Sequence, residues 1–257
     1  MRLAIIGGTG VYEFRVAQGG ETVSAATPYG TVEVRAAPVA DREVFFLARH
    51  GADHSVPPHR INYRANLAAL KQLGCTVVFA TNAVGSLRTD LPPASFLLPD
   101  QFIDFTRARA LTFYDGGDEH GVRHVDFTEP YCRSARRWLA AAASDCGETC
   151  AFGGTYLCAE GPRFETPAEI RMFGQWGADV VGMTCVPEVV LARELGLCYA
   201  SLCLVTNFAA GLSPTPLSHQ EVTDLMAERI AALNGVLEAA VARAVEAPGC
   251  LCRRPII

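Results

Sequence analysis

The sequence lacks the features that place a protein in a membrane or on a nucleic acid. No apolar stretch reaches the roughly 18–20 residues that a membrane-spanning helix needs. No basic stripe is clustered along the chain, and the net charge is −5 with an isoelectric point near 5.7. No signal peptide precedes Met1-Arg2-Leu3-Ala4. We therefore expect a cytoplasmic protein with a small-molecule partner, and neither a membrane nor a nucleic-acid partner.

The ten cysteines do not have the spacing of a zinc-binding or disulfide-rich domain. No pair of Cys-x-x-Cys knuckles is present. Cys198 and Cys203 lie in the apolar run 197–204, where a free cysteine packs as a small hydrophobe. We therefore expect reduced cysteines, in keeping with a cytoplasmic location.

Short apolar runs between turn residues alternate with segments of helical period. With 257 residues, half of them hydrophobic, the chain is expected to form one domain over residues 1–248, with a peripheral tail over 249–257. The fold class we predict is α/β, with a mixed, largely parallel central sheet flanked by helices. An exposed loop is expected over Asp115–Asp126. The expected strands are Leu3–Ile6, Glu43–Ala48, Val77–Ala80, Ser95–Leu98, Asp179–Met183 and Cys198–Val205, and the expected helices are Tyr63–Leu73, Thr166–Trp176, Glu188–Leu195 and Glu221–Val245.

Polar clusters follow five of the predicted strands, where ligands bind in open α/β sheets. After the first comes Ile6–Gly10 (IGGTG), whose glycines let backbone N–H groups approach an anion while Thr9 adds a donor. A dinucleotide site is disfavoured because the third glycine of that motif is absent, and there is no Walker lysine. The alternative is that Ile6–Gly10 is a tight turn that binds no ligand.

Three further segments offer anion or sugar ligands. Arg49 has a fork suited to phosphate, and the imidazole of His50 can donate another hydrogen bond; a solvated surface loop is the alternative. A metal site at His50, His54 and His59 is disfavoured by their spacing across Pro57-Pro58. The loop with Asn82 and Ala83 can serve a phosphate or ribose, or be a simple turn. Met183 can cover a ribose while Thr184 donates to an anion, or Met183 can be a core residue.

The most informative pair is Glu165, in segment 160–166 (EGPRFET), with Asn207, in segment 205–208 (VTNF). A carboxylate only accepts hydrogen bonds, whereas an amide both donates and accepts. Together they can recognise a ring that presents N–H beside C=O. That is the edge of a 6-oxopurine such as hypoxanthine or guanine.

Taken together, these segments resemble the trimeric purine nucleoside phosphorylase superfamily, and within it the methylthioadenosine phosphorylase branch. The resemblance runs from Ile5 to about Ser218 and rests on segments 47–51 (LARHG), 62–66 (NYRAN), 160–164 (EGPRF) and 183–189 (MTCVPEV) in that order. It implies phosphate-binding roles for Thr9, Arg49, His50, Asn82, Ala83 and Thr184. It further implies substrate-binding roles for Phe164, Glu165, Met183, Asn207, Phe208, Ala209, His219 and His124.

The individual roles follow from the same resemblance. Met183 lies under the ribose, Phe164 stacks on the purine, Asn207 contacts N7 and O6, and Glu165 faces N1–H. His124 is expected to reach the 5′ end of the nucleoside from a neighbouring subunit, which implies a homotrimer. Asn207, His50 and Arg49 are the expected catalytic residues. No metal and no organic cofactor is implied, and inorganic phosphate is a co-substrate.

The sequence departs from the methylthioadenosine pattern at the base. That branch has Asp-x-Asp where this chain has Asn207-Phe208-Ala209, and Ser where it has Glu165. A 6-amino base opposite Asn207 and Glu165 would leave buried polar groups mispaired, at about 1–3 kcal/mol per group. The expected activity is phosphorolysis of inosine or guanosine in purine salvage.

The group at the 5′ position is harder to predict. His219 falls where 6-oxopurine phosphorylases bond the 5′-hydroxyl, but it can equally be a helix-start residue beside the Ser218 cap. An S-methyl-5′-thioinosine phosphorylase is therefore the alternative, and a methylthioadenosine phosphorylase is less favoured. A hydrolytic nucleosidase or a non-catalytic nucleoside-binding module are the rival classes.

Overall fold

The computed structural model describes residues 1–8, 11, 20–116, 121–213, 218–247 and 249–253. Thr9, one of the predicted phosphate-binding residues, lies outside the described residues, as does the tail beyond Arg253. No helix in the described ranges is both long and apolar enough to cross a membrane.

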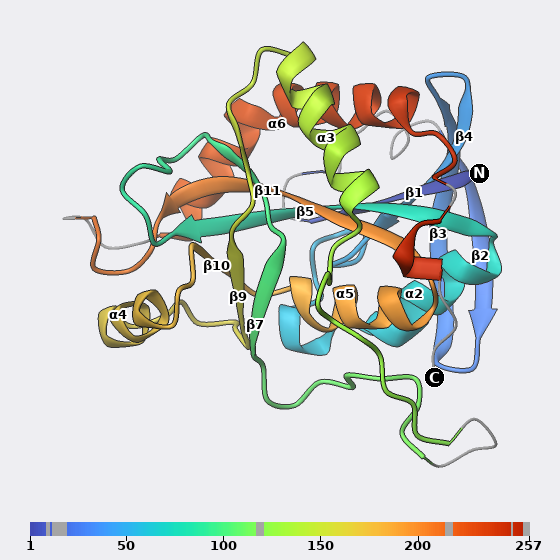
Figure 1. Ribbon diagram of the computed structural model, residues 1–257, viewed down its shortest axis with the longest axis horizontal. Coiled ribbons are helices and arrows are strands. Elements are labelled where there is room, and N and C mark those ends of the chain that lie inside the picture. The colour runs from blue at the N-terminus through green and yellow to red at the C-terminus, as the bar shows by residue number, and fades with distance from the viewer. Residues whose placement is uncertain (9–10, 12–19, 117–120, 214–217, 248, 254–257) are drawn as a thin grey trace.

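The described residues build one mixed sheet flanked by helices, which confirms the predicted α/β class (Figure 1). Its main path runs β2-β3-β4-β1-β5-β10-β9-β7, and β11, β6 and β8 branch from the second edge of β5. The strands are β1 (Arg2–Gly7), β2 (Glu21–Thr27), β3 (Gly30–Val39), β4 (Arg42–Ala48), β5 (Cys75–Ser86), β6 (Phe96–Leu98), β7 (Gln101–Phe105), β8 (Cys150–Phe152), β9 (Thr155–Ala159), β10 (Val180–Gly182) and β11 (Cys198–Phe208). Strands β4, β1, β5 and β11 pair in parallel and form its centre.

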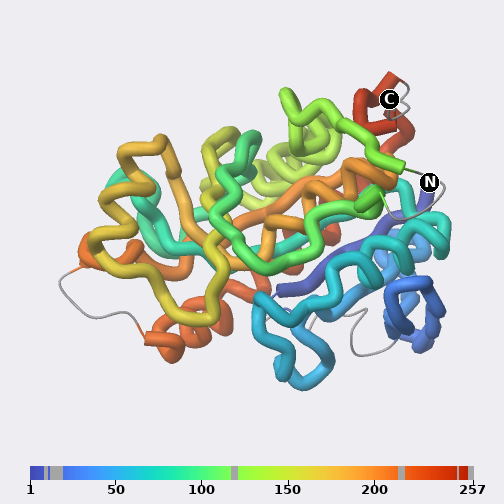
Figure 2. The backbone as a smooth tube through the Cα atoms, turned by 90° about the horizontal axis from the view of Figure 1, so that it is seen from below, coloured from blue at the N-terminus to red at the C-terminus, as the bar shows by residue number. Residues whose placement is uncertain are grey.

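Helices cover both faces of the sheet. They are α2 (Tyr63–Gln72), α3 (Arg133–Asp145), α4 (Pro167–Gln175), α5 (Cys185–Glu194) and α6 (His219–Arg243), with 3-10 turns η2 (Pro58–Arg60) and η3 (Leu251–Arg253). Helices α3 and α6 lie on one face, and α2 and α5 on the other (Figure 1). The tube view shows η3 at the same end of the molecule as the start of β1 (Figure 2).

The alternation of side chains along β1 shows why its sequence is continuously apolar. Leu3 and Ile5 pack toward α3 and α6, whereas Ala4 and Ile6 pack into the core on the side of α2 and α5. All four side chains are fully buried. A central parallel strand covered on both faces needs apolar residues at every position, which is what the run predicts.

Strands β5 and β11 are longer than expected, and this difference shapes the molecule's main cavity. β1 pairs with β5 only as far as Ile6 opposite Ala80, while β11 pairs with β5 through to Ser86. β10 joins the same edge of β5 as β1, at Gly85 and Ser86. The prediction that Thr81–Ser86 is a loop is therefore wrong. It is strand, and its edge at Thr81–Val84 opens between β1 and β10.

Several elements were not predicted from the sequence. The β2–β3 hairpin and β7 have polar residues among their apolar ones, and β8 and β9 are only 3 and 5 residues long. The helix α3 was also not predicted. In the tail, Cys252 is buried against the core on the side of α3 and α6, so residues 249–253 are attached to the domain more closely than a peripheral tail implies.

Candidate active site

A cavity of about 480 Å³ opens at the carboxyl end of the central strands, within the range typical of small-ligand sites. It is lined by eleven of the residues predicted to bind ligand: Arg49, His50, Asn82, Ala83, Phe164, Glu165, Met183, Thr184, Asn207, Ala209 and His219. Phe208 does not line it, although its carbonyl bonds Asn207. His124 lies exposed on the predicted loop, away from the cavity of its own chain.

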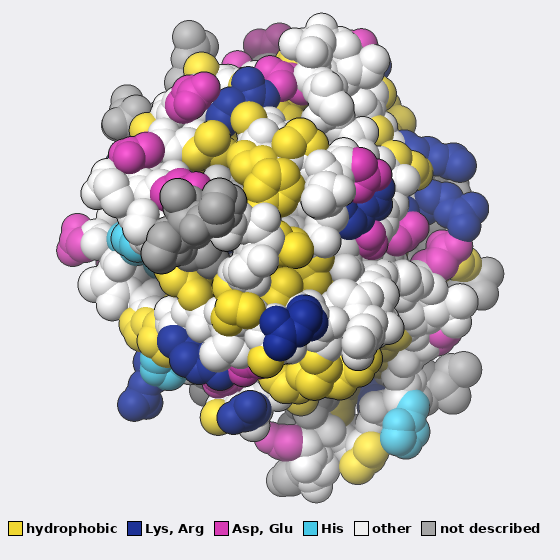
Figure 3. Space-filling model, turned by 90° about the vertical axis from the view of Figure 1, so that its left-hand side faces the viewer, with side chains coloured by type: hydrophobic (Ala, Val, Ile, Leu, Met, Phe, Trp, Pro, Cys, Tyr) yellow, Lys and Arg dark blue, Asp and Glu magenta, His cyan; other side chains and the backbone are white. Residues whose placement is uncertain are grey.

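The end of the molecule toward which β5 and β11 run carries hydrophobic side chains gathered across its middle (Figure 3). Exposed large hydrophobic residues in the segments at this end include Phe164, Trp176 and Leu212. Phe164 therefore combines an exposed ring with a place in the cavity wall, as a stacking residue requires.

Arg49 follows β4 and is fixed by a buried ion pair. Its Nε and Nη2 donate to the two carboxylate oxygens of Glu188 at 2.8 and 2.7 Å, and both side chains are fully buried. Tyr199 donates its hydroxyl to the same carboxylate at 2.7 Å. A planar two-point pair of this kind orients the guanidinium more firmly than a single contact would.

The remaining contacts of Arg49 leave part of it available to a ligand. Nη1 donates to the Thr81 carbonyl at 2.8 Å, and Nη2 to Asn82 Oδ1 at 3.5 Å. Of the five N–H groups of a guanidinium, one on Nη1 has no partner among these bonds. A Cβ on Gly8 would stand 2.9 Å from Nη1 and 2.7 Å from the Thr81 carbonyl, so only glycine fits there.

The charge on Arg49 is secure. Burial opposes it, but the charge of Glu188 and the hydrogen bonds to it raise the pKa of Arg49 above its usual value. Breaking such a buried pair by neutralising one partner costs about 3–5 kcal/mol. Glu188 and Tyr199 were not among the predicted site residues. The signal that could have found Glu188 is a single carboxylate in an otherwise apolar segment, 185–192.

Asn82 and Thr184 are joined across the cavity floor. Asn82 Nδ2 donates to Thr184 Oγ1 at 3.0 Å, and its Oδ1 accepts from Ser201 at 3.2 Å. Because the Thr184 oxygen accepts from Asn82, its own O–H can donate to a ligand. Thr184 is also the residue before α5.

His50 is held by Val56, with the ring Nδ1 2.9 Å from the Val56 carbonyl. Since a carbonyl only accepts, Nδ1 carries the proton, and in the neutral ring Nε2 is an acceptor. Burial and the neighbouring charge of Arg49 lower the pKa of His50 to about 4. From the sequence, His50 was expected to donate a hydrogen bond to the phosphate. The neutral ring instead fits a phosphate that carries its own proton.

Asn207 is set into the cavity by an irregularity in β11. The pairing with β5 shifts between Val205 and Asn207, so Thr206 is an extra residue of the strand. Its hydroxyl donates to Asn207 Oδ1 at 2.8 Å, and Asn207 Nδ2 donates to the Phe208 carbonyl at 2.9 Å. These bonds fix which end of the amide is which, and each end keeps one further hydrogen-bonding position.

Glu165 lies directly before α4 and is half-buried. α4 begins with a capping box in which Thr166 and Glu169 bond each other's backbone N–H. Arg163 binds both carboxylate oxygens of Glu169, which ties the segment before Glu165 to the helix. Burial raises the pKa of Glu165 above its usual value of 4.5.

Met183 directly follows β10 and packs against the turn of segment 160–166. A Cβ on Gly161 would stand 2.6 Å from the Met183 sulfur, and the φ of Gly161 is +66°. Both facts require glycine at this position. The Glu160-Gly161-Pro162 motif therefore makes room for the methionine side chain.

His219 is the first residue of α6, following the Ser218 cap, and it also lines the cavity. His219 is therefore a helix-start residue that also faces the cavity, and its contact with a 5′-hydroxyl stays a prediction. Burial, and after it the charge of His219, lower the pKa of His54. The centroids of the His54 and His50 rings lie 4.6 Å apart, and the rings are tilted by 39°.

Comparison with known proteins identifies the family of this chain. The family model described as the phosphorylase superfamily matches residues 2–242. A probable 6-oxopurine nucleoside phosphorylase of Dictyoglomus turgidum is 50% identical over 256 residues, covering 100% of this chain and 97% of the relative. A probable S-methyl-5′-thioinosine phosphorylase of Methanothermobacter thermautotrophicus is 48% identical, covering 99% of this chain and 88% of the relative. The structure of a methylthioadenosine phosphorylase from Schistosoma mansoni in complex with adenine is 35% identical, with a TM-score of 0.89 over 94% of this chain and 91% of that one.

The chain belongs to the phosphorylase superfamily. The resemblance drawn from the sequence motifs is confirmed, and so is the prediction that the protein is an enzyme of this class.

Proposed function

We propose that the protein cleaves the N-glycosidic bond of 6-oxopurine nucleosides with phosphate, giving the purine base and ribose 1-phosphate. The observation that carries this proposal is the joint presence of Glu165 and Asn207 in the wall of one cavity with Arg49. The acceptor carboxylate suits N1–H, and the amide suits N7 and O6. The relatives named 6-oxopurine nucleoside phosphorylases support it.

Phosphate is proposed to lie under the sugar, at the side of the cavity formed by Gly8, Arg49, Asn82 and Thr184. It would accept hydrogen bonds from the free Nη1–H of Arg49, the Thr184 hydroxyl and the Ala83 backbone N–H, and donate one from its own O–H to His50 Nε2. Thr9 is expected to add a donor. The bound anion both stabilises the cationic sugar of the transition state and attacks it.

Asn207 acts on the leaving group. As the glycosidic bond breaks, electrons move into the purine, and Asn207 Nδ2 stabilises the charge that develops at O6. A preoriented donor of this kind contributes about 3–4 kcal/mol to lowering the barrier. No metal or organic cofactor takes part in the proposed reaction.

At the 5′ end we favour a hydroxyl group, since His219 lines the cavity with a polar side chain. S-methyl-5′-thioinosine is the second candidate, supported by a relative of 48% identity and by Val222 in the same wall. His124, exposed in its own chain, is proposed to complete this end from a neighbour in a homotrimer. A cytoplasmic location remains part of the proposal.

The test compares nucleosides one at a time with saturating phosphate. Inosine, guanosine, methylthioinosine, methylthioadenosine and adenosine are supplied separately, and kcat/KM is ranked. Either 6-oxopurine ribonucleoside is expected to exceed adenosine by at least about tenfold to a hundredfold. Turnover that persists without phosphate would indicate a hydrolase and contradict the proposal.

A paired variant tests the recognition of the base. Glu165→Ser with Asn207→Asp is expected to move preference toward 6-amino purines, because a protonated aspartate can donate to N7 and serine can pair with a ring that has no N1–H. If the folded variant still rejects adenosine and methylthioadenosine, the proposed base contacts are wrong.

A further inference from the structure

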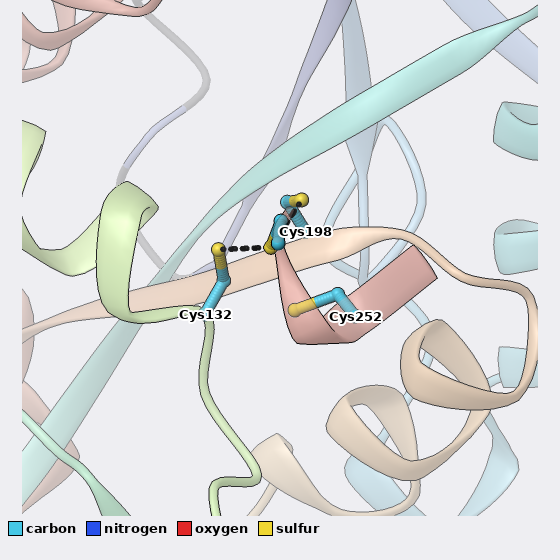
Figure 4. Close-up of side chains that lie close together, drawn as sticks. Cys132, Cys198 and Cys252 are labelled. Atoms are coloured by element: carbon cyan, nitrogen blue, oxygen red, sulfur yellow. Dashed lines mark hydrogen bonds between the residues drawn. The ribbon is translucent and has the colours of Figure 1, made fainter. Parts of the chain in front are cut away.

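Four cysteines from three separate segments converge at the end of β11 opposite the cavity. They are Cys132, Cys198, Cys250 and Cys252, and their sulfur atoms all lie within 4.8 Å of one another. Cys250 Sγ is 3.6 Å from Cys132 Sγ and 3.5 Å from Cys198 Sγ. Figure 4 shows Cys132, Cys198 and Cys252 gathered at this point. Among the described residues this is the one group of three or more candidate metal ligands found that close together.

Rigid parts of the fold hold two of these thiols in place. Cys132 is the residue before α3, and its backbone N–H donates to the Tyr199 carbonyl at 2.8 Å. Cys198 is the first residue of β11, opposite Val77 of β5. The other two, in the Cys-Leu-Cys sequence at η3, come from beyond the last long helix. The cluster is therefore where the C-terminal segment meets the core.

Ordinary packing does not account for this convergence. A thiol is a weak hydrogen-bond donor and acceptor, so four thiols gain little from facing one another. Four sulfur ligands at about 2.3 Å around a tetrahedral zinc ion lie about 3.8 Å apart. The observed spacings need only small shifts to reach that arrangement. Three of the thiols are buried and Cys250 is partly exposed, which provides a route from solvent.

We propose that Cys132, Cys198, Cys250 and Cys252 bind one zinc ion as a tetrahedral site that fastens the C-terminal segment to α3 and β11. Four sulfur ligands select a thiophilic metal over magnesium or calcium. Binding releases four thiol protons to solvent and involves no oxidation. A closed set of four protein ligands, with none left for water, is the pattern of a structural site rather than a catalytic one.

The sequence spacing had argued against zinc because the four ligands do not form two Cys-x-x-Cys knuckles. The structure supplies the second pair from residues 66 positions apart, at the start of a helix and the start of a strand. This proposal is independent of the nucleoside pocket, and either can fail without the other.

The experiment uses the full chain, purified with a reductant and without chelators. Metal analysis is expected to find about one zinc per chain. In the Cys250→Ser/Cys252→Ser variant the zinc content per chain is expected to fall at least tenfold. In Cys150→Ser it is expected to stay the same. Cys150 is a matched control because it is partly exposed, like Cys250, but lies outside the cluster. Replacing zinc by cobalt(II) should give the sulfur-to-cobalt absorption and tetrahedral spectrum of a four-thiolate site.

Zinc should also raise Tm in the parent protein by about 5 °C or more and leave Tm of the double variant unchanged. The kcat for phosphorolysis should stay within twofold, which shows that the variant is folded. A Cys132→Ser variant gives the same test from the core side of the cluster. Two results would overturn the proposal: ten reactive thiols in a protein that takes up no zinc, or four fewer reactive thiols without metal, which would indicate two disulfides.

Discussion

The two ends of β11 have different chemistry on one strand. At its start, Cys198 faces three other thiols; near its end, Asn207 faces the cavity. Cys198 pairs with Val77 and Asn207 with Gly85, eight steps along β5, so the backbones of the two residues are about 26 Å apart. At the cavity end, Arg49, Asn82 and Thr184 are linked by hydrogen bonds, Asn207 is held by Thr206 and the Phe208 carbonyl, and these side chains keep positions for a ligand. At the other end, four thiols lie against one another.

The cavity end of β11 suits the binding of substrate, and the thiol end suits a contact that stabilises the fold. Hydrogen bonds that hold a side chain in place while leaving one position open are what a substrate site needs. A group of soft ligands with no open position suits a resident metal. Changes at the cavity end should therefore alter kinetic constants, and changes at the thiol end should alter stability alone.

The largest effect is expected from Glu188→Gln, which removes the charge that holds Arg49. The free energy of unfolding should fall by about 3–5 kcal/mol because a buried guanidinium loses its partner, and KM for phosphate should rise more than tenfold. Urea unfolding and phosphate kinetics measure the two effects. Glu194→Gln is the matched control, since Glu194 is also a buried carboxylate of α5 but bonds Thr112 and the Phe113 N–H instead. If Glu194→Gln weakens phosphate binding equally, Glu188 has no specific role at the cavity.

Next comes Asn207→Leu, a change of similar shape that removes the amide. Loss of one transition-state donor should lower kcat for inosine about 100-fold to 1000-fold, while KM for phosphate changes little. Thr206→Val, which removes only the hydroxyl that bonds Asn207 Oδ1, should lower kcat by a smaller factor of about ten. An unchanged kcat in Asn207→Leu would remove Asn207 from the mechanism.

A smaller effect is expected from Gly161→Ala. The added Cβ meets the Met183 sulfur, so KM for the nucleoside should rise several-fold. The positive φ should also lower the free energy of unfolding by about 1–2 kcal/mol. Gly177→Ala has the same kind of positive φ, with no atom within 4 Å of the new Cβ. It should lose similar stability and keep its KM. Equal KM changes in both variants would show that Met183 does not contact the sugar.

The smallest effect concerns pH. Burial raises the pKa of Glu165, so its acceptor carboxylate is lost as pH falls through a value above 4.5. KM for inosine should therefore rise on mild acidification. With a pKa lowered to about 4, His50 stays neutral over that range and does not contribute. In Glu165→Gln the rise should disappear; a rise that persists there belongs to another group.

Much of the cavity end could be predicted from the sequence, because its motifs lie on continuous segments after apolar strands. The fold class and most of the central strands followed from runs such as Leu3–Ile6. The bonds from Arg49 and Tyr199 to Glu188 could not be predicted, since Arg49 lies 139 positions from Glu188 and the three residues, from the end of β4, from α5 and from β11, meet only in the folded chain. The acceptor role of His50 depends on the Val56 carbonyl, a backbone atom that no sequence pattern reports.

The thiol end was missed for a related reason. Cys198 was recognised as part of an apolar strand, which is correct, but a strand residue can also be the end of a cluster. Its three partners come from the start of a helix that was not predicted and from a segment expected to be peripheral. Local spacing describes only ligands that are neighbours in sequence.

The proposed phosphorolysis depends most directly on where the purine base and the phosphate bind. A crystal structure of the protein with hypoxanthine and phosphate tests it. We expect Glu165 within hydrogen-bond distance of N1, Asn207 at N7 and O6, and phosphate against Arg49 Nη1 and Thr184. Hypoxanthine or phosphate bound elsewhere, with these side chains unoccupied, would contradict the account.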